Sequence, residues 1–271
     1  MEALGNDFIV INALIKKIIP SRALIKKLAD RHFGIGADQV LIIEKAKNKK
    51  ADFHYRIFNA DGSEAEQCIN GVRCLGKYLY DKKYTNKKHL NLSSVVGIAH
   101  ISLESNGEVT AEIPAPILPP KKISLLVKQQ ALHYKLKVAA KTIKIGALSV
   151  GNPHAVLRVK SINEAPMILA HAIATHRLFP QGMNVNFVEI ISPQHIKLRT
   201  YERGTGETLA CGSGAAATVA MGRLWKLLGA VVKVDLPFGH LTVTWSSLVS
   251  PIYIRGQVVT VFEGIINFNF F

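Results

Sequence analysis

The chain contains two copies of one cysteine-bearing motif, and this repeat constrains the fold more than any other feature of the sequence. The first copy reads R-I-F-N-A-D-G-S-E-A-E-Q-C from Arg56 to Cys68, and the second reads R-T-Y-E-R-G-T-G-E-T-L-A-C from Arg199 to Cys211. In each copy an Arg stands twelve residues before the Cys and a Gly stands three residues after it. The copies are separated by an offset of 143 positions, which predicts an internal duplication.

Other short segments recur in the same order. L-G-N-D-F at 4–8 resembles V-G-N-P-H at 150–154, and Q-V-L-I-I-E at 39–44 resembles N-V-N-F-V-E at 184–189. We therefore predict an α+β fold with two pseudo-symmetric lobes, each with many short strands and one main helix. The proline-rich segment P-A-P-I-L-P-P marks the boundary, with residues 1–116 in the N-terminal lobe and 117–258 in the C-terminal lobe. A last strand over 259–271 is expected to return to the N-terminal lobe.

The residues after Cys68 have helical spacing. Helical periodicity predicts a helix that directs Val72, Leu75 and Leu79 inward and Arg73, Lys77 and Lys82 outward. Cys74, beside Leu75 in the middle of this helix, is interpreted as inert packing. An earlier helix is expected to begin after Ser21 as its N-cap and to stop at Gly34.

Cys68 and Cys211 each precede a predicted helix, where unpaired backbone N–H groups and the helix dipole stabilise a thiolate. The same N–H groups can bind a carboxylate. If the carboxylate of an α-amino acid pointed at both helix starts, one thiolate would remove the α-proton and the other thiol would add a proton on the opposite face. Such a pair titrates as a coupled unit and inverts the stereocentre.

We expect neither a cofactor nor a metal. The sequence has no signature that establishes a pyridoxal site, and His171 and His176 lack a carboxylate or cysteine at ligand spacing. Three cysteines are too few for a disulfide framework and favour a reducing, cytoplasmic location. No apolar run reaches the ~18 residues that span a bilayer.

The net charge of +15 comes partly from lysine clusters at 45–50, 82–88 and 121–122. These clusters lack the interleaved aromatic residues of a single-strand-binding surface. We interpret them as solvated surface and expect no nucleic-acid partner and no membrane partner.

Taken together, these segments closely resemble the diaminopimelate epimerases, which are pyridoxal-independent enzymes of lysine and peptidoglycan-precursor synthesis. The resemblance runs through nearly the whole chain and also includes G-I-G-A-D-Q at 34–39 and V-F-E-G at 261–264. It implies that each lobe is a strongly curved, barrel-like, mostly antiparallel sheet around a central helix, and that the protein is a homodimer. It also implies epimerisation of LL-diaminopimelate to meso-diaminopimelate by two cysteines, without a cofactor.

The resemblance assigns Cys68 and Cys211 as the acid/base pair and His154 and Glu202 as residues that tune their pKa values. Backbone amides of Ile69, Asn70, Gly212 and Ser213 would bind the reacting carboxylate. Glu202 would bind an ammonium group and Arg203 the distal carboxylate. The side chains expected to line the substrate pocket are Asn6, Gln39, Asn59, Asn152 and Asn184.

The sequence departs from the family pattern at Ile69, where the family usually has a glycine that lets the backbone approach the ligand. A helical backbone at this position would leave the amide usable. Two alternatives to the epimerase stay open: a racemase of another amino acid, such as the proline racemase type, and a catalytically impaired relative that binds a carboxylate. Asn59, Glu202 and Arg203 argue against a small cyclic substrate, which needs no distal charge clamp.

Overall fold

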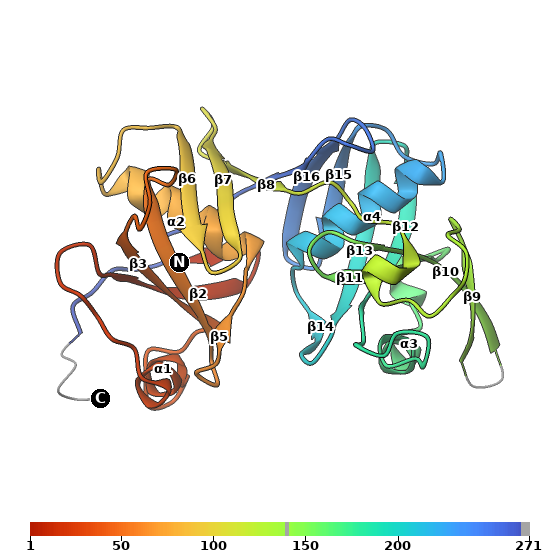
Figure 1. The fold of residues 1–271 in the computed structure, drawn as a ribbon, viewed down its shortest axis with the longest axis horizontal. Coiled ribbons are helices and arrows are strands. Elements are labelled where there is room, and N and C mark those ends of the chain that lie inside the picture. Colours follow the sequence, from red (N-terminus) through yellow and green to blue (C-terminus); the bar gives the residue numbers. More distant parts are fainter. Residues whose placement is uncertain (139–140, 267–271) are drawn as a thin grey trace. The chain divides into compact units, whose positions relative to one another are not determined.

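The structure, a computed structural model, describes residues 1–138 and 141–266 (Figure 1). The chain forms two units. Unit 1 comprises Met1–Ala111 together with the residues from Gly256 onward, and unit 2 comprises Glu112–Arg255. Within the described ranges, no helix has the length and apolar character needed to cross a membrane.

The described part of unit 1 is built from short strands and two helices. Its strands are β1 (Glu2–Ala3), β2 (Asn6–Asn12), β3 (Gln39–Lys45), β4 (Phe53–Asn59), β5 (Glu64–Ala65), β6 (His89–Ser94), β7 (Gly97–Leu103) and β8 (Val109–Ile113), the last of which runs just past the unit boundary. The helices are α1 (Arg22–Ala29) and α2 (Ile69–Asp81). Strand β2 is parallel to β3, and β4 is antiparallel to β3 and β5 and parallel to β6. The remaining pairs, β6–β7 and β7–β8, are antiparallel.

Unit 2 repeats this arrangement. Its strands are β9 (Tyr134–Val138), β10 (Lys141–Ser149), β11 (Pro153–Arg158), β12 (Asn184–Ser192), β13 (His195–Glu202), β14 (Gly206–Thr208), β15 (Val231–Leu236), β16 (Gly239–Trp245) and β17 (Ile252–Gly256). Its α-helices are α3 (Ala170–Ala174) and α4 (Gly212–Leu224), and its short 3₁₀ turns are Pro120–Ile123, Ile162–Glu164 and Met167–Leu169. Strand β11 is parallel to β12, and β13 is antiparallel to β12 and β14 and parallel to β15. The pairs β15–β16 and β16–β17 are antiparallel.

The order and direction of pairing in β2–β8 therefore match those in β11–β17, strand for strand. The main helices correspond as well, because α2 lies against β7 and α4 lies against the equivalent strand β16. Gly76 allows the close approach in unit 1, since a Cβ at this position would lie 2.6 Å from the Ile101 side chain. The predicted α+β class and its internal duplication are confirmed.

The repeated Arg of the cysteine motif has a structural role in both units. Arg56 on β4 makes a bidentate ion pair with Glu64 on β5, with N–O distances of 2.8 and 2.7 Å. Arg199 on β13 pairs in the same way with Glu207 on β14, at 2.7 and 3.0 Å. Bidentate pairing fixes orientation as well as distance. Each pair thus holds the short hairpin that leads into a cysteine.

The first helix begins where the sequence predicts and ends earlier. The Ser21 hydroxyl accepts a hydrogen bond from the Leu24 N–H at 3.1 Å, as an N-cap does. Helix α1 ends at Ala29 because Asp30 Oδ1 accepts hydrogen bonds from the N–H groups of His32 and Phe33. The expected stop at Gly34 is wrong by one turn.

Helix α2 buries Val72, Leu75 and Leu79, as its periodicity predicts. The expectation for Arg73 is wrong. Its side chain does not point outward, and the residue is 0% exposed. A buried guanidinium is expensive unless it has partners.

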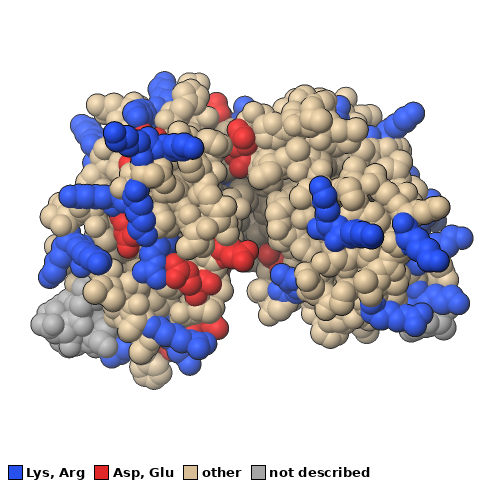
Figure 2. Space-filling view, in the orientation of Figure 1, with Lys and Arg blue, Asp and Glu red and all other residues tan. Residues whose placement is uncertain are grey.

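The described residues after Gly256 contact the N-terminal part of unit 1 at two places. Glu2 and Val259 form an isolated antiparallel bridge, and the Lys82 ammonium pairs with Glu263. The described part of the segment expected to be a strand over 259–271 makes this one bridge, and residues 267–271 lie outside the described residues. In the face shown in Figure 2, Lys and Arg side chains lie in separate groups among uncharged residues rather than in one continuous patch.

Candidate active site

Cys68 and Cys211 occupy equivalent positions in the two units. Cys68 is the N-cap of α2, with φ −139° and ψ 117°, and Cys211 is the N-cap of α4, with φ −121° and ψ 105°. Both helices are 13 residues long, so the dipole is fully developed at each cysteine. The predicted placement of each cysteine at a helix start is confirmed.

Cys211 is 4% exposed, and its neighbours have opposing effects on its thiol. Burial, and then the nearby Glu202 carboxylate, raise its pKa well above the usual range. The Gly214 N–H donates to the sulfur at 3.4 Å, and the Ser213 hydroxyl lies 3.4 Å from it, which lowers the pKa. The balance keeps Cys211 protonated in this state, with an amide positioned to stabilise a thiolate.

Glu202 is itself fixed in place, because the Thr208 hydroxyl donates to its carboxylate at 2.6 Å. Gly214 allows Asn186 and Thr200 to pack against the first turn of α4, next to Cys211. A Cβ at this position would lie 2.5 Å from Asn186 Oδ1 and 2.9 Å from the Thr200 hydroxyl. Only a glycine leaves room for both polar atoms beneath the first turn of α4.

His154 lies at the centre of a buried hydrogen-bond network in unit 2. Asn186 Nδ2 also donates to the Ala155 carbonyl, which can only accept, so this amide donates to His154 Nδ1 at 3.0 Å. The imidazole proton is therefore on Nε2, which donates to Asn152 Oδ1 at 2.9 Å. Complete burial lowers the pKa of His154 to about 3, so the ring is neutral.

The network reaches the cysteine through two further contacts. Asn152 Nδ2 donates to the Ser213 hydroxyl at 3.4 Å, and this hydroxyl contacts the Cys211 sulfur. Asn184 also contacts the His154 ring, with Nδ2 3.5 Å from Nε2. Its Oδ1 accepts a hydrogen bond from the Arg203 backbone N–H at 2.8 Å. Hydrogen bonds therefore link Cys211, Ser213, Asn152, His154 and Asn184 in one network, which the Arg203 backbone joins through Asn184.

Cys68 has a different environment. Its Sγ–H donates to Asn6 Oδ1 at 3.7 Å, and Asn70 Nδ2 donates to the same oxygen at 3.3 Å. Asn6 Nδ2 donates to the Asp38 carboxylate at 2.9 Å. Cys68 is partly exposed, whereas Cys211 is buried. Unit 1 thus gathers three of the predicted residues, Cys68, Asn6 and Asn70, into one cluster.

Gln39 and Asn59 face each other on neighbouring strands of unit 1. Gln39 Nε2 donates to Asn59 Oδ1 at 2.9 Å, and Asn59 Nδ2 donates to the Ser63 hydroxyl at 3.1 Å. Gln39 Oε1 is buried and has no partner among the described residues. A buried acceptor without a partner is costly, and a ligand that donates a hydrogen bond would satisfy it.

Ile69 occupies the position of the family glycine without backbone strain. It is the first residue of α2 and is not among the described residues with positive φ. The residue is buried, with 9% of its surface exposed. A β-branched residue is tolerated because no left-handed conformation is required here.

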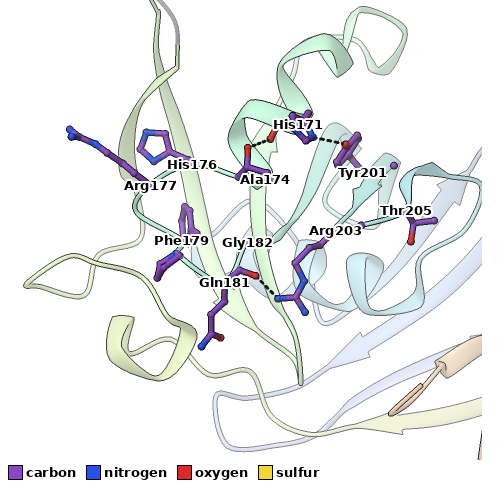
Figure 3. Close-up of a pocket in the computed structure, with 14 residues that line it drawn as sticks. His171, Ala174, His176, Arg177, Phe179, Gln181, Gly182, Tyr201, Arg203 and Thr205 are labelled. Carbon is purple, nitrogen blue, oxygen red and sulfur yellow. Dashed lines mark hydrogen bonds between the residues drawn. The ribbon is translucent and has the colours of Figure 1, made fainter. Parts of the chain in front are cut away.

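Arg203 lines a pocket of about 580 Å³ in unit 2 (Figure 3). Its guanidinium donates to the Gln181 carbonyl at 2.6 Å, as the dashed line in Figure 3 shows. In the same pocket His171 Nδ1 lies 3.0 Å from the Tyr201 hydroxyl. Arg203 is exposed, and its charge is available to a ligand.

Four polar residues that hold the site side chains in place are not predicted from the sequence. Asp38 binds Asn6, Thr208 binds Glu202, and Asn186 and Thr200 bind each other at 3.0 Å below Cys211. Asn186 carried a usable signal, because it stands two residues after Asn184 and so faces the same side of the strand. The other three had none, since their partners are distant in sequence or on another strand.

Two kinds of comparison identify relatives of the chain from its sequence. Residues 1–116 and 146–261 match the family model described as diaminopimelate epimerase. A diaminopimelate epimerase from Alkalilimnicola ehrlichii is 44% identical over 99% of this chain and 98% of its own length. A diaminopimelate epimerase from Thioalkalivibrio sulfidiphilus is 44% identical over 98% of this chain and 97% of its own.

Solved structures share the fold at much lower identity. A phenazine biosynthesis protein of the PhzF family from Bacillus anthracis has a TM-score of 0.68 at 18% identity, covering 98% of this chain and 95% of its own. A hydroxyproline epimerase from Agrobacterium vitis has a TM-score of 0.66 at 16% identity, covering 94% of this chain and 86% of its own. At these identities the likeness concerns the fold alone.

Proposed function

The chain belongs to the diaminopimelate epimerase family, and on that premise we propose that it epimerises LL-diaminopimelate to meso-diaminopimelate without a cofactor. The enzyme is thus an isomerase of lysine and peptidoglycan-precursor synthesis. Its substrate is a small amino acid, and we propose that it works in the cytoplasm as a homodimer.

The acid/base pair is Cys68 and Cys211. One thiolate accepts the α-proton as the Cα–H bond breaks, and the thiol of the other gives its proton to the opposite face of the same carbon. Each turnover exchanges the protonation states of the two sulfurs, and proton exchange with solvent resets them before the next molecule of the same isomer reacts. The α-carboxylate takes up charge in the transition state, and the N–H groups of the first helical turns stabilise it.

One observation carries this proposal: each cysteine is the N-cap of the main helix of one of two repeated units. A helix N-terminus both lowers the energy of a thiolate and binds a carboxylate. Two such ends, each with a thiol, are suited to a reaction in which a proton leaves one face of a carbon and enters the other.

Substrate recognition falls to the polar side chains of both units. The unpartnered Gln39 Oε1 would accept a hydrogen bond from a substrate ammonium, and Asn59 is held beside it. Glu202 would pair with an ammonium and Arg203 with the distal carboxylate. His154 is neutral and would orient Asn152 toward Ser213 through a hydrogen bond, and it would not place a positive charge near the cysteine. The remaining contacts are proposed for Asn6, Ile69, Asn70, Asn184 and Gly212.

Deuterium incorporation from heavy water at the α-carbon of LL-diaminopimelate tests the function. The wild type should exchange this proton and form the meso isomer, and Cys68→Ala and Cys211→Ala should each lose at least ~10³-fold in rate. Cys74→Ala is the matched control, because this thiol is buried in the middle of α2 with its pKa raised to about 12.

Three outcomes would contradict parts of this assignment. A wild type that leaves diaminopimelate unexchanged refutes the function. Faster exchange of proline than of diaminopimelate would instead favour the proline racemase type. Full activity in both single cysteine variants would refute the two-cysteine mechanism.

A further inference from the structure

Arg73 is a buried cation in the helix that begins at Cys68. Its Nη2 donates to Asn70 Oδ1 at 2.9 Å and its Nη1 donates to the Gln257 carbonyl at 3.3 Å. Nε has no partner among the described residues. Burial lowers the pKa of the guanidinium, which nevertheless stays protonated because an arginine keeps its charge in proteins. The acceptors of these two hydrogen bonds are an amide oxygen and a carbonyl oxygen, neither of which carries a full negative charge.

The charge has no counterpart in unit 2. At the repeat offset of 143, Arg73 corresponds to Ala216, and Glu202 corresponds to Asn59. Cys211 therefore has a carboxylate as its charged neighbour, whereas the helix of Cys68 contains a buried cation. The two cysteines share the same helix-terminal geometry and differ in the sign of the nearby charge.

Arg73 also fixes the amides that surround Cys68. A guanidinium can only donate, so Asn70 must present Oδ1 to it and turn Nδ2 toward Asn6. Asn6 then presents Oδ1 to Asn70 and to the Cys68 thiol, and its Nδ2 reaches Asp38. The Arg73 guanidinium, which can only donate, therefore determines the orientation of the Asn70 and Asn6 amides.

Four ionisable groups act on the Arg73 charge, and Cys68 is one of them. The thiols of Cys74 and Cys68 and the carboxylates of Glu108 and Glu2 each raise the pKa of Arg73, against the lowering effect of burial. Burial raises the pKa of Cys74 to about 12, so that thiol stays neutral. Three other ionisable groups lie near this cluster: the Tyr55 phenol, whose pKa burial raises, the Asp38 carboxylate bound to Asn6, and the N-terminal ammonium, whose charge lowers the pKa of Cys74.

We propose that Arg73 is a positioning residue that supplies the buried positive charge balancing the Cys68 thiolate and, through Asn70, fixes the Asn6 amide that accepts from the Cys68 thiol. This inference rests on the proposed function, in which Cys68 must exist in both protonation states during each cycle. The protonated sulfur donates to Asn6 Oδ1, and the ionised sulfur is stabilised by the guanidinium. Because the thiol and the thiolate of Cys68 are both stabilised, the two forms differ less in free energy, and proton transfer to or from the sulfur costs less.

The test is the pH dependence of Cys68 alkylation by iodoacetamide, followed by peptide mass, in a Cys211→Ala background without substrate. Arg73→Met removes the charge and should raise the apparent pKa of Cys68 by ~1 unit or more, as loss of a nearby opposite charge does. Alkylation at pH 7 would then slow ~10-fold. Asn70→Asp keeps the guanidinium but gives it a carboxylate partner, and it should raise the apparent pKa in the same direction.

Arg223→Met is the matched control, because Arg223 lies near the end of the equivalent helix α4 and donates to the Trp245 carbonyl rather than to a neighbour of either cysteine. It should leave the Cys68 profile unchanged. An unchanged profile in both Arg73→Met and Asn70→Asp would overturn the proposal, and Asn70→Asp decides alone if Arg73→Met does not fold.

Isotope exchange separates this proposal from the function on which it rests. In the enzyme with both cysteines, Arg73→Met should move the pH profile of kcat for deuterium exchange to higher pH, and Arg73→Lys should restore part of the shift. A wild type inactive on diaminopimelate would refute the proposed function. The alkylation profiles would still decide whether Arg73 balances the Cys68 thiolate.

Discussion

Replacement of His154 by Gln is expected to remove a large part of the protein's sensitivity to mild acid. His154 is 0% exposed and its pKa in the folded protein is about 3, because burial disfavours the charged ring. In the unfolded chain an imidazole has a pKa of ~6.5. Below that pH the unfolded state binds a proton that the folded state does not, so stability falls as pH decreases from 6.5 toward 3.

The two pKa values set the size of the effect. At pH 5 the unfolded state gains ~2 kcal/mol from protonation of this one group, whereas at pH 7 it gains ~0.2 kcal/mol. Wild type should therefore lose ~2 kcal/mol more stability between pH 7 and pH 5 than His154→Gln loses. The Gln amide retains a donor for Asn152, and this keeps the network in place at neutral pH.

Urea unfolding at the two pH values measures the difference, since the free energy of unfolding extrapolates linearly with denaturant. His240→Gln, at an exposed position, is the control for loss of an imidazole and must follow the wild type. Equal pH dependence in wild type and His154→Gln would refute the reasoning. It would mean that the ring becomes protonated in the folded state and that the hydrogen-bond network around Asn152 adapts to the charge.

Three further predictions concern the residues next to the cysteines. Gly214→Ala should lower the free energy of unfolding by ~1–3 kcal/mol, because its Cβ would lie 2.5 Å from a buried amide oxygen. Gly229→Ala, where the nearest atom is 3.5 Å away, should be near neutral in the same denaturant titration. Glu202→Gln should lower the Cys211 pKa, because the carboxylate raises it; an unchanged pH profile of Cys211 alkylation would count against this. Ile69→Gly should cost ~1–3 kcal/mol of stability from lost burial and leave the exchange rate within ~3-fold of wild type, whereas a large gain in rate would show that the side chain obstructs the amide.

The repeat in the sequence was sufficient to predict the architecture because it combines two independent signals. A cysteine followed by a glycine and small or apolar residues marks a helix start, and the Arg twelve residues earlier marks the hairpin before it. Arg56 and Arg199 make the same bidentate ion pair with Glu64 and Glu207. A local pattern that appears twice with equal spacing predicts local structure well.

Helical periodicity wrongly predicts an outward-facing Arg73, because it assigns every charged side chain to the solvent-facing side of a helix. The guanidinium is buried because Asn70, one turn earlier, and Gln257, 184 residues away in sequence, both offer it acceptors. The first of these partners was within reach of sequence reasoning at i−3. The second is supplied by a segment from the end of the chain, and no local pattern predicts it.

The symmetric repeat explains why the sequence predicted two equivalent cysteines, and the residues that break the repeat explain why they are not equivalent. Two helix N-termini act on both thiols with the same sign, so the helices cannot by themselves make one an acid and the other a base. The difference must come from positions where the copies diverge: Glu202 stands where the first copy has Asn59, and Arg73 stands where the second copy has Ala216. A carboxylate favours the thiol and a guanidinium favours the thiolate. The duplication thus provides the geometry for a proton transfer on each face, and its two unmatched charges favour a resting enzyme in which Cys68 is ionised and Cys211 is protonated.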